Sequence, residues 1–443
     1  MTRISVPRPL RLKVALIGVS SPGYRSLALA YLRAYAENDP RLSAVGFTTL
    51  ELDTHLDPWW IAYRALALDP DVVAFSVVCW NARSVYEAAR IIAAARPDIR
   101  VILGGPEVGP IAEQVLAEQS SVTAIVRGEG EITFTELLVT LLKEGELTRV
   151  EGLTARREGR VVSAPDRRLI SDLDEIPSPY LTGVLAPVVG STYIEGYRGC
   201  PHSCSYCFEG KGYGRVRRFS QERVAAEIQA IVAAGVRTFS FIDPVFNLTN
   251  ERLTWLSDTL APHAAHGVRL HTVEVDIERI GAAEAALLVR AGVLSVETGP
   301  QSVGELALAS CHRRFDREAF MRGVQACRAA GIAVECDLIV GLPGDTVDDV
   351  LAGIDFAIAA DPGIVQISTL HILPGTELWE RARELGLVFD PHPPHEVIAT
   401  RDLSFGDLRR LEALGKAATG LYRARSTGAS HTHDPQPLAG AGL

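Results

Sequence analysis

No stretch of this 443-residue sequence approaches the roughly 20 consecutive apolar residues that a membrane-spanning helix needs. The first apolar run, residues 14–19, is also too short for the hydrophobic region of a signal peptide, and we expect it to form a strand. Basic residues are in no excess, because 44 Lys and Arg stand against 54 Asp and Glu, a net charge of −10. This balance disfavours binding to nucleic acid or to an anionic membrane. We therefore expect a cytoplasmic protein with a small-molecule or short peptidic substrate.

Cysteine is scarce, and its distribution argues against disulfides. The sequence has seven cysteines, an odd number, and no recognisable secretory signal. Three of them, Cys200, Cys204 and Cys207, fall within eight residues, a spacing that reduced thiols holding a metal explain better. The other four form no C-x2-C pair, and we interpret them as small buried hydrophobic residues. These four are Cys79, Cys311, Cys327 and Cys336.

The length of the chain exceeds the usual size of a single hydrophobic core, so two domains are expected. Between residues 13 and 145, short and fully apolar runs alternate with amphipathic segments. This alternation is typical of a parallel sheet that helices cover on both faces. It predicts an α/β fold over residues 1–148, a flavodoxin-like (Rossmann-type) domain with five strands. The expected strands are residues 14–18, 44–47, 72–77, 101–105 and 123–126.

The alternation stops over residues 149–192, which we interpret as a linker with a hairpin at 151–162 and a proline-rich segment at 176–179. It resumes over residues 193–380. Six βα units are too few for a closed eight-stranded barrel, so we predict a partial (βα)6 barrel with its site at the carboxyl ends of the strands. A helical segment over 381–425 and a disordered tail over 426–443 follow. The expected barrel strands are residues 193–197, 238–243, 269–275, 294–297, 333–340 and 365–370.

The most specific motif follows the first predicted barrel strand and reads Gly199-Cys200-Pro201-His202-Ser203-Cys204-Ser205-Tyr206-Cys207. Iron–sulfur clusters normally have four cysteine ligands, so three thiols in one loop would leave one iron of a [4Fe-4S] cluster open for chemistry. The alternative is a structural zinc ion with His202 or a distant histidine as fourth ligand. The position at the catalytic face of a predicted barrel and the C-x3-C-x-aromatic-C spacing favour the cluster.

This motif and its setting resemble the radical S-adenosylmethionine (SAM) superfamily over residues 190–380. The resemblance implies that Cys200, Cys204 and Cys207 bind the cluster, and that the open iron chelates the amino and carboxylate groups of SAM. It also implies that Tyr206, the aromatic residue before the third cysteine, lies near the adenine. One-electron reduction, from a donor such as flavodoxin or ferredoxin, would then cleave SAM to a 5′-deoxyadenosyl radical that abstracts an unactivated hydrogen atom.

Further segments around the predicted barrel resemble the same superfamily. Asp243 is similar in position to a residue that contacts the methionine amino group, and Glu274 resembles a carboxylate that contacts the ribose. The alternatives that carry no function are a helix N-cap at Asp243 and an ion pair on the barrel rim at Glu274. The motifs at 297–302 and 341–346 resemble recurring strand-four and strand-five motifs. The cofactor-binding candidates that they add are Glu297, Gln301, Gly341 and Pro343.

The N-terminal domain has two interpretations, a corrinoid-binding domain or a methylthiotransferase-type domain with a second cluster. The second needs three cysteines, and this region has only Cys79. The first is supported by residues at the carboxyl edge of the sheet, where ligands bind open α/β sheets. Glycine there lets the backbone approach a bulky ring, although ordinary turns use glycine as well. Residues 70–135 resemble cobalamin-dependent radical SAM enzymes, which implies cobalamin contacts at Ser76, Gly104, Gly105 and Gly128.

The loop after the first strand departs from the usual cobalamin motif D-x-H-x-x-G, whose histidine ligates cobalt. The sequence there is Ser20-Ser21-Pro22-Gly23-Tyr24. Asp53-Thr54-His55 follows the second strand instead and has Pro58 in place of the glycine, so we interpret His55 as a surface residue. The resemblance therefore implies base-off cobalamin without a histidine ligand, or a domain that has lost the cofactor.

These resemblances together imply a cobalamin-dependent radical SAM methyltransferase of the class B type. The expected reaction transfers a methyl group to an unactivated carbon, or to phosphorus, of a small metabolite or natural-product intermediate. One alternative is a cobalamin-linked radical rearrangement or oxidative cyclisation without methyl transfer. Another is a non-catalytic sensor that binds metal and corrinoid. The sequence predicts neither the substrate nor a catalytic side chain, since residues 371–425 contain no recognisable pattern.

Overall fold

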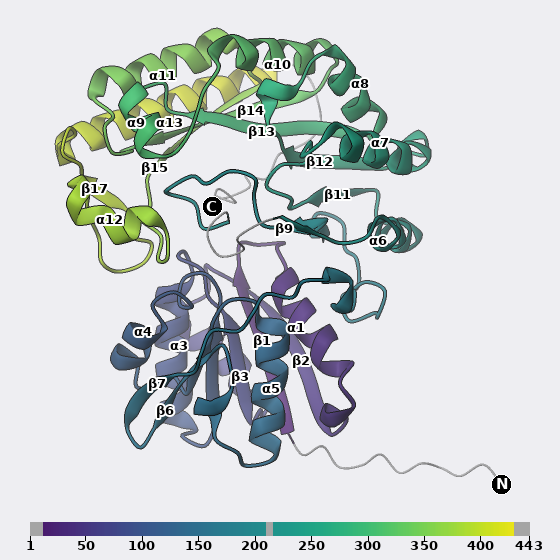
Figure 1. The fold of residues 1–443 in the computed structure, drawn as a ribbon, viewed down its shortest axis with the longest axis vertical. Helices are drawn as coiled ribbons and strands as arrows, with labels where there is room; N and C mark the ends of the chain where they lie inside the picture. The colour runs from purple at the N-terminus through teal and green to yellow at the C-terminus, as the bar shows by residue number, and fades with distance from the viewer. Residues whose placement is uncertain (1–11, 210–215, 429–443) are drawn as a thin grey trace. The chain divides into compact units, whose positions relative to one another are not determined.

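The computed structural model describes residues 12–209 and 216–428. The chain divides into two compact units, Met1–Ala186 and Pro187–Leu443, each built from a mainly parallel sheet and its helices (Figure 1). The predicted disordered tail lies outside the described residues from residue 429 on. Within the described residues, no helix is both long and apolar enough to cross a membrane.

The first unit contains a seven-stranded sheet of order β2-β1-β3-β4-β5-β6-β7. Its first five strands are parallel and have the flavodoxin-like order predicted from the sequence. The hairpin that we assigned to a linker extends this sheet instead, because Ala155 of β6 pairs antiparallel with Ala124 of β5 and both are fully buried. The strands are β1 (Leu12–Ser20), β2 (Val45–Asp53), β3 (Val72–Ser76), β4 (Arg100–Gly104), β5 (Ala124–Val126), β6 (Leu153–Arg157) and β7 (Arg160–Ser163).

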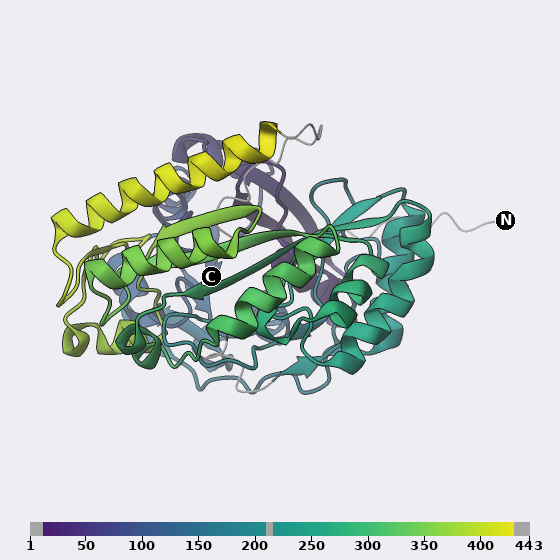
Figure 2. The same cartoon turned by 90° about the horizontal axis from the view of Figure 1, so that it is seen from above.

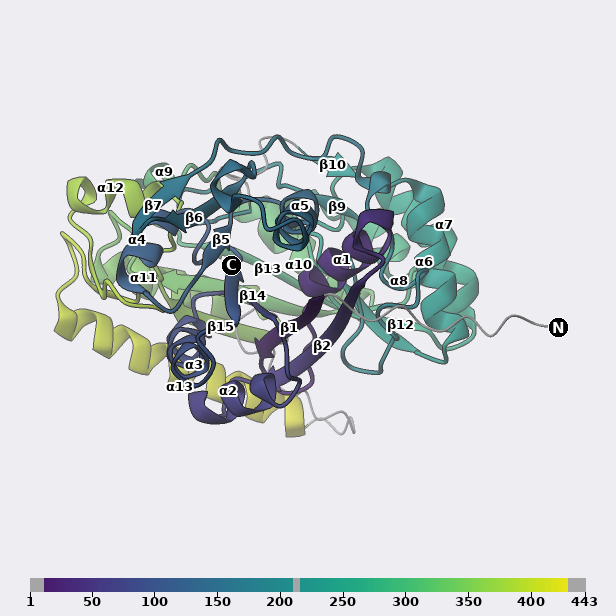
Figure 3. The same cartoon turned by 90° about the horizontal axis from the view of Figure 1, so that it is seen from below.

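Helices cover both faces of this sheet (Figure 3). Successive side chains of a strand point to opposite faces, so Ile17 of β1 packs with α2, α3 and α4, whereas Leu16 packs with α1 and α5. Burial on both faces explains why these strands are continuous apolar runs in the sequence. The helices are α1 (Leu27–Glu37), α2 (Pro58–Leu66), α3 (Ala82–Ala95), α4 (Ala112–Glu118) and α5 (Gly130–Leu142).

The second unit contains six parallel strands in the order β15-β14-β13-β12-β11-β8, which confirms the partial (βα)6 barrel. A short antiparallel ribbon, β9 (Tyr197–Arg198) with β10 (Arg217–Arg218), brackets the cysteine motif. The barrel strands are β8 (Tyr193–Ile194), β11 (Thr238–Phe241), β12 (Arg269–Glu274), β13 (Val293–Gln301), β14 (Ala333–Val340) and β15 (Ile364–Thr369). The helices that follow them are α6 (Gln221–Ala233), α7 (Asn250–Ala265), α8 (Ala282–Arg290), α9 (Glu305–Ser310), α10 (Arg317–Ala329) and α11 (Val347–Ala360).

The chain after the barrel is less uniformly helical than the sequence suggested. Helix α12 (Glu377–Leu385) is followed by a small antiparallel pair, β16 (Val388–Phe389) and β17 (Val397–Ala399). The long helix α13 (Phe405–Gly428) then packs along β15 and α11, where it forms the yellow outer rod of Figure 2. Because β15 is an edge strand, this packing shields one side of the open barrel.

Candidate active site

The segment that we call the cysteine loop, residues 199–209, is anchored at its base by a buried ion pair. The carboxylate of Asp243 accepts a hydrogen bond from the Gly196 N–H (2.6 Å) and pairs with the guanidinium of Arg252. A Cβ atom on Gly196 would lie 2.3 Å from Arg252 Nη2, so only glycine leaves room for this contact. The Tyr197 hydroxyl adds a second anchor, since it donates to the Val245 carbonyl (2.9 Å) and accepts from the Val245 N–H (2.8 Å).

Ser205 fixes the middle of the cysteine loop from two directions. This fully buried residue donates through its N–H to the Cys311 carbonyl (3.2 Å) and through Oγ to the Ser310 carbonyl (3.1 Å), both at the end of α9. Its own carbonyl accepts from the Leu378 N–H in α12 (3.0 Å). The backbone between the second and third cysteines is therefore held by two other segments of the same unit.

The three thiols of the loop are free to act as metal ligands. Cys204 is buried, Cys200 and Cys207 are half-buried, and all three are free thiols. Burial raises the pKa of Cys200 to about 11 and that of Cys207 to about 12, so both would need a metal to stabilise their thiolates. Among the described residues, no three Cys, His, Asp or Glu side chains converge as one ion requires.

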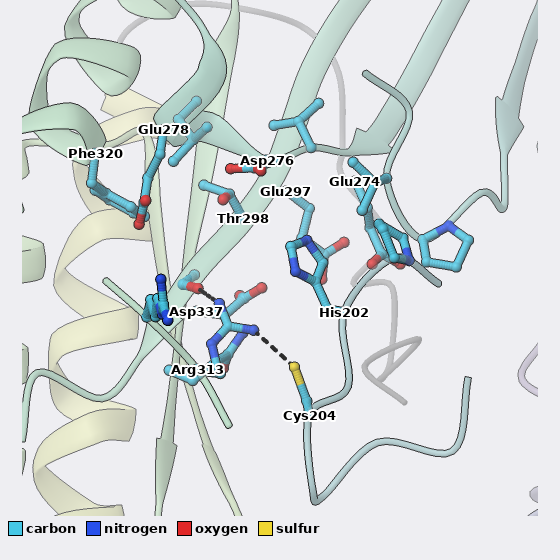
Figure 4. A pocket seen from close by; sticks show the side chains of 18 of the residues that line it. His202, Cys204, Glu274, Asp276, Glu278, Glu297, Thr298, Arg313, Phe320 and Asp337 are labelled. Atoms are coloured by element: carbon cyan, nitrogen blue, oxygen red, sulfur yellow. Dashed lines mark hydrogen bonds between the residues drawn. The ribbon is translucent and has the colours of Figure 1, made fainter. Parts of the chain in front are cut away.

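A cavity of about 460 Å³ lies beside the cysteine loop at the carboxyl ends of β12, β13 and β14 (Figure 4). The loop contributes Cys204 and the residues just before it, including His202. Neighbouring parallel strands end at the same edge, which is why residues far apart in the sequence meet here. Of the residues predicted to bind a cluster or cofactor, those that line the cavity are Cys204, Glu274, Glu297 and Gln301.

Of the five carboxyl groups that line this cavity, three lie on neighbouring strands and form what we call the acidic wall: Glu274, Glu297 and Asp337. The first two stand directly opposite each other in the β12/β13 pairing. The Glu274 side chain faces the cavity, but the surrounding protein removes much of the water that would stabilise its charge. This desolvation, together with the charge of Glu297, raises the pKa of Glu274 to about 8. Burial likewise raises the pKa of Glu297 and, with the neighbouring carboxyls, that of Asp337 well above the usual value. Such a wall suits a cationic ligand.

Sequence reasoning missed Asp337 and also Arg313, which faces the cysteine loop from the residues after α9. The Arg313 guanidinium donates to Cys204 Sγ (3.5 Å) and to the Tyr206 hydroxyl (3.0 Å) through Nη1, and to the Gly299 carbonyl (2.8 Å) through Nη2. Figure 4 shows it beside the sulfur of Cys204, with a dashed line between the two groups. The alternation of β14 could have pointed to Asp337, whereas no local pattern marks Arg313.

Four of the predicted SAM contacts, like Cys200 and Cys207, lie outside the lining of the cavity. Asp243 uses its carboxylate on Gly196 and Arg252, so the geometry favours a structural role for it over direct contact with a cofactor. Tyr206 is buried under Arg313. Gly341 has φ +99°, and a Cβ there would lie 2.7 Å from Val397 Cγ1, which explains the glycine by packing. Pro343 is buried beyond the same turn.

In the first unit, the four predicted cobalamin contacts lie on neighbouring strand ends. Ser76 pairs with Gly104, and Gly104 pairs with Val126 just before Gly128. Gly105 has φ +116°, and a Cβ there would lie 2.3 Å from the Val77 carbonyl, so the close approach that it permits is to the neighbouring loop. A Cβ on Gly128 would have no described atom within 4 Å, which leaves this part of the edge accessible to a large ring.

Asn81, another residue that the sequence did not indicate, ties this edge together. Its buried amide donates to the carbonyls of Val19 (2.9 Å) and Ser76 (3.1 Å), which end β1 and β3. The neighbouring Trp80 exposes 48% of its surface and offers a flat apolar face. His55 is exposed, as expected, and is the only histidine in residues 1–186 of the sequence. The open edge fits a corrinoid, but one without a histidine ligand from the first loop.

Comparison with known families agrees with both sites. The family model of the B12 binding domain matches residues 14–138, and that of the Radical SAM superfamily matches residues 194–357. The chain therefore carries a B12-binding domain followed by a radical SAM domain. The resemblance seen in the sequence is confirmed.

Individual relatives are similar over most of this chain. The uncharacterized methyltransferase PH0819 of Pyrococcus horikoshii is 28% identical over 83% of this chain and 80% of its own length. The cobalamin-dependent radical SAM methyltransferase TokK of Streptomyces tokunonensis is 27% identical over 83% of this chain, which spans only 56% of TokK. The anaerobic magnesium-protoporphyrin IX monomethyl ester cyclase of Rubrivivax gelatinosus is 27% identical over 82% of this chain and 67% of its own length.

A solved structure supports the fold. That of the radical SAM methyltransferase TsrM from Kitasatospora setae, with cobalamin and a [4Fe-4S] cluster bound, has a TM-score of 0.67. It covers 86% of this chain and 78% of its own at 22% identity. The two-domain α/β architecture predicted from the sequence is thus a known one.

Proposed function

We propose that this protein is a cobalamin-dependent radical SAM methyltransferase that acts on an unactivated carbon, or on phosphorus, of a small metabolite or natural-product intermediate. The observation that carries the proposal is the pairing of two features in one chain. One is a three-thiol loop beside an acid-lined cavity, and the other is a domain that matches the B12-binding family. The two methyltransferases named above, PH0819 and TokK, each match more than four fifths of the chain, which supports the same reaction class.

The side chains of the cavity have distinct parts in this proposal. Cys200, Cys204 and Cys207 would hold a [4Fe-4S] cluster and leave one iron open to SAM. The cluster, SAM and cobalamin supply the electron, the radical and the methyl carrier, while the protein binds and orients them. Glu274, Glu297 and Asp337 would compensate the positive sulfonium and ammonium groups of SAM. In the first unit, Ser76, Gly104, Gly105 and Gly128 would border the corrinoid.

The proposal extends to partners and location. A small or short peptidic substrate and a one-electron donor such as flavodoxin or ferredoxin would complete the reaction. A donor of this kind, together with seven unpaired cysteines, is consistent with the reducing interior of a cell, so we propose the cytoplasm.

The testing experiment is anaerobic reconstitution with iron, sulfide and cobalamin, followed by metal analysis and incubation with SAM, a reductant and candidate substrates. We expect about four irons and one cobalt per chain, an electron paramagnetic resonance signal that SAM perturbs, and both 5′-deoxyadenosine and S-adenosylhomocysteine among the products. Zinc without iron would refute the cluster. Iron without cobalt would retain the radical chemistry and remove cobalamin from the proposal.

A cobalamin-linked oxidative cyclisation or rearrangement is the second candidate, and the similarity to the cyclase of Rubrivivax gelatinosus favours it. The mass of the product separates the two reactions, since methyl transfer adds one CH2 unit. Release of 5′-deoxyadenosine without S-adenosylhomocysteine, and with no gain of CH2, would support the cyclase type of reaction.

A further inference from the structure

Arg313 has a contact that cofactor binding alone does not require. Its Nη1 lies 3.5 Å from Sγ of Cys204, the most buried of the three loop cysteines. The side chain reaches the sulfur from the residues after α9, so it is no part of the cysteine loop itself. A guanidinium carries a permanent positive charge and donates directed hydrogen bonds. This sulfur therefore has a fixed cation beside it.

Two further hydrogen bonds fix the position of the guanidinium. Nη1 also donates to the Tyr206 hydroxyl (3.0 Å), and Nη2 donates to the Gly299 carbonyl on β13 (2.8 Å). Tyr206 is buried, so this bond is shielded from water. A guanidinium held at a sulfur, a phenol and a strand carbonyl cannot swing away without leaving these groups unpaired. The positive charge of Arg313 is therefore held in a fixed position beside the Cys204 sulfur.

The electrostatic surroundings make the charge of Arg313 important. The same cavity is lined by Glu274, Glu297 and Asp337, whose raised pKa values mark surroundings that disfavour negative charge and therefore also oppose the addition of an electron nearby. A positive charge and an N–H···S hydrogen bond act in the other direction, because they stabilise the more negative, reduced state of an iron–sulfur cluster. Arg313 offsets the acidic wall at the sulfur where the electron density would rise.

We infer that Arg313 is a positioning residue that raises the reduction potential of the cluster through Cys204 and so makes its one-electron reduction easier. The step adds one electron from a low-potential donor and neither adds nor removes a proton. The inference rests on the cluster of the proposed function, but not on cobalamin or on methyl transfer. It assigns to Arg313 a role that exists before SAM binds.

The test is an anaerobic redox titration of the reconstituted full-length protein without SAM, followed by electron paramagnetic resonance. Arg313→Gln should lower the equilibrium constant for reduction about tenfold, which for a one-electron couple is a potential 59 mV more negative. Arg313→Lys, which keeps the charge but loses the planar fork, should shift it less. The control is Arg314→Gln, which removes the same charge from an exposed neighbour in the cavity lining and should leave the potential near that of the wild type.

Iron content separates the possible failures. If Arg313→Gln holds four irons and has the wild-type potential without SAM, the inference is overturned, and Arg313 acts only on a ligand in the cavity. An equal shift in Arg314→Gln would also overturn it, since general charge would then explain the effect. If Arg313→Gln takes up no iron, Arg313→Lys becomes the deciding variant. The inference then requires that the reduction potential of the cluster in Arg313→Lys be more negative than in the wild type. Absence of iron in the wild type would instead refute the proposed function.

Discussion

Single residues in this protein owe their roles to their neighbours more than to their type. Cys204 and Cys311 are both buried cysteines, and the backbone carbonyl of Cys311 accepts from Ser205 next to Cys204. Only Cys204 lies in the loop with two further thiols and has a guanidinium at its sulfur. Cys311 contacts Ser205 through its backbone carbonyl and through its thiol, but it lies outside the three-thiol loop, so its thiol should be dispensable for binding of the cluster.

Substitution of these two cysteines tests the three-thiol assignment. Cys204→Ala should abolish stable binding of the cluster, because two thiolates cannot hold it. Cys311→Ala should keep about four irons per chain and lose only the stability of a small buried side chain, on the order of 1 kcal/mol. Iron and sulfide analysis after anaerobic reconstitution measures both variants. Loss of iron in Cys311→Ala would show that the cluster has a fourth cysteine ligand.

The raised pKa of Glu274 predicts a pH dependence of SAM binding. With a pKa of about 8, this carboxyl is mostly protonated in the free protein at pH 6.5 and must lose its proton to pair with a cation. The affinity for SAM should therefore rise with pH by up to roughly tenfold per unit below pH 8 and level off above it. Isothermal titration of the reconstituted protein from pH 6.5 to 9 measures this profile.

Two variants give this profile its control. Glu274→Gln should remove much of the pH dependence and weaken binding at pH 9 by roughly tenfold, since the ionic partner is lost. Glu222→Gln makes the same change on the exposed face of α6 and should leave the profile unaltered. A pH dependence that persists in full in Glu274→Gln would assign it to another group.

At the scale of elements, glycines with positive φ follow neighbouring strands but for different reasons. Gly105 lies where the loop after β4 meets the loop after β3, and its neighbour Gly104 accepts from the Val77 N–H (2.7 Å). Gly128 follows β5 and has open space where a side chain would be. The first glycine is needed for packing, whereas the second is needed only for its backbone conformation and for access.

This difference predicts unequal effects of alanine. Gly105→Ala should lower the free energy of unfolding by more than about 3 kcal/mol, because the new Cβ meets the Val77 carbonyl and φ is +116°. Gly128→Ala should cost only about 1–2 kcal/mol, the strain of a left-handed alanine. Chemical denaturation measures both, and cobalamin affinity should fall in Gly128→Ala if this edge binds the corrinoid. Equal stabilities would contradict the packing argument.

At the scale of the whole molecule, the division into two compact units predicts that each cofactor protects its own segments. Hydrogen–deuterium exchange should slow with cobalamin in residues 72–81, 100–109 and 124–130, since ligands that bind the native state suppress local opening. SAM should slow exchange in residues 196–209 and 293–301 of the cluster-loaded protein. Cys204→Ala should abolish the effect of SAM and keep that of cobalamin in the first unit. Protection by cobalamin confined to the second unit would contradict the assignment of the corrinoid edge.

The sequence by itself determined the elements and their order. Apolar runs separated by amphipathic segments marked the first five strands and the six barrel strands. The reason is that a strand buried on both faces of a sheet is apolar along most of its length. The same holds for Cys200, Cys204 and Cys207, whose spacing within one loop is a local property. Glu274 and Glu297 were proposed from their resemblance to superfamily motifs, and the structure places both in the lining of the cavity.

Tertiary structure alone decided which side chains meet. The hairpin β6–β7 joined the first sheet because its buried residues fit the free edge of β5, and no local pattern distinguishes such a hairpin from a linker. The carboxylate of Asp243 binds Gly196 and Arg252. Arg313, more than a hundred residues after Cys204, donates a hydrogen bond to the Cys204 sulfur. Sequence patterns record burial and local geometry, but contacts between distant segments depend on how packed strands and helices align. For that reason the cysteine loop could be recognised in the sequence, and the charge of Arg313 beside it could not.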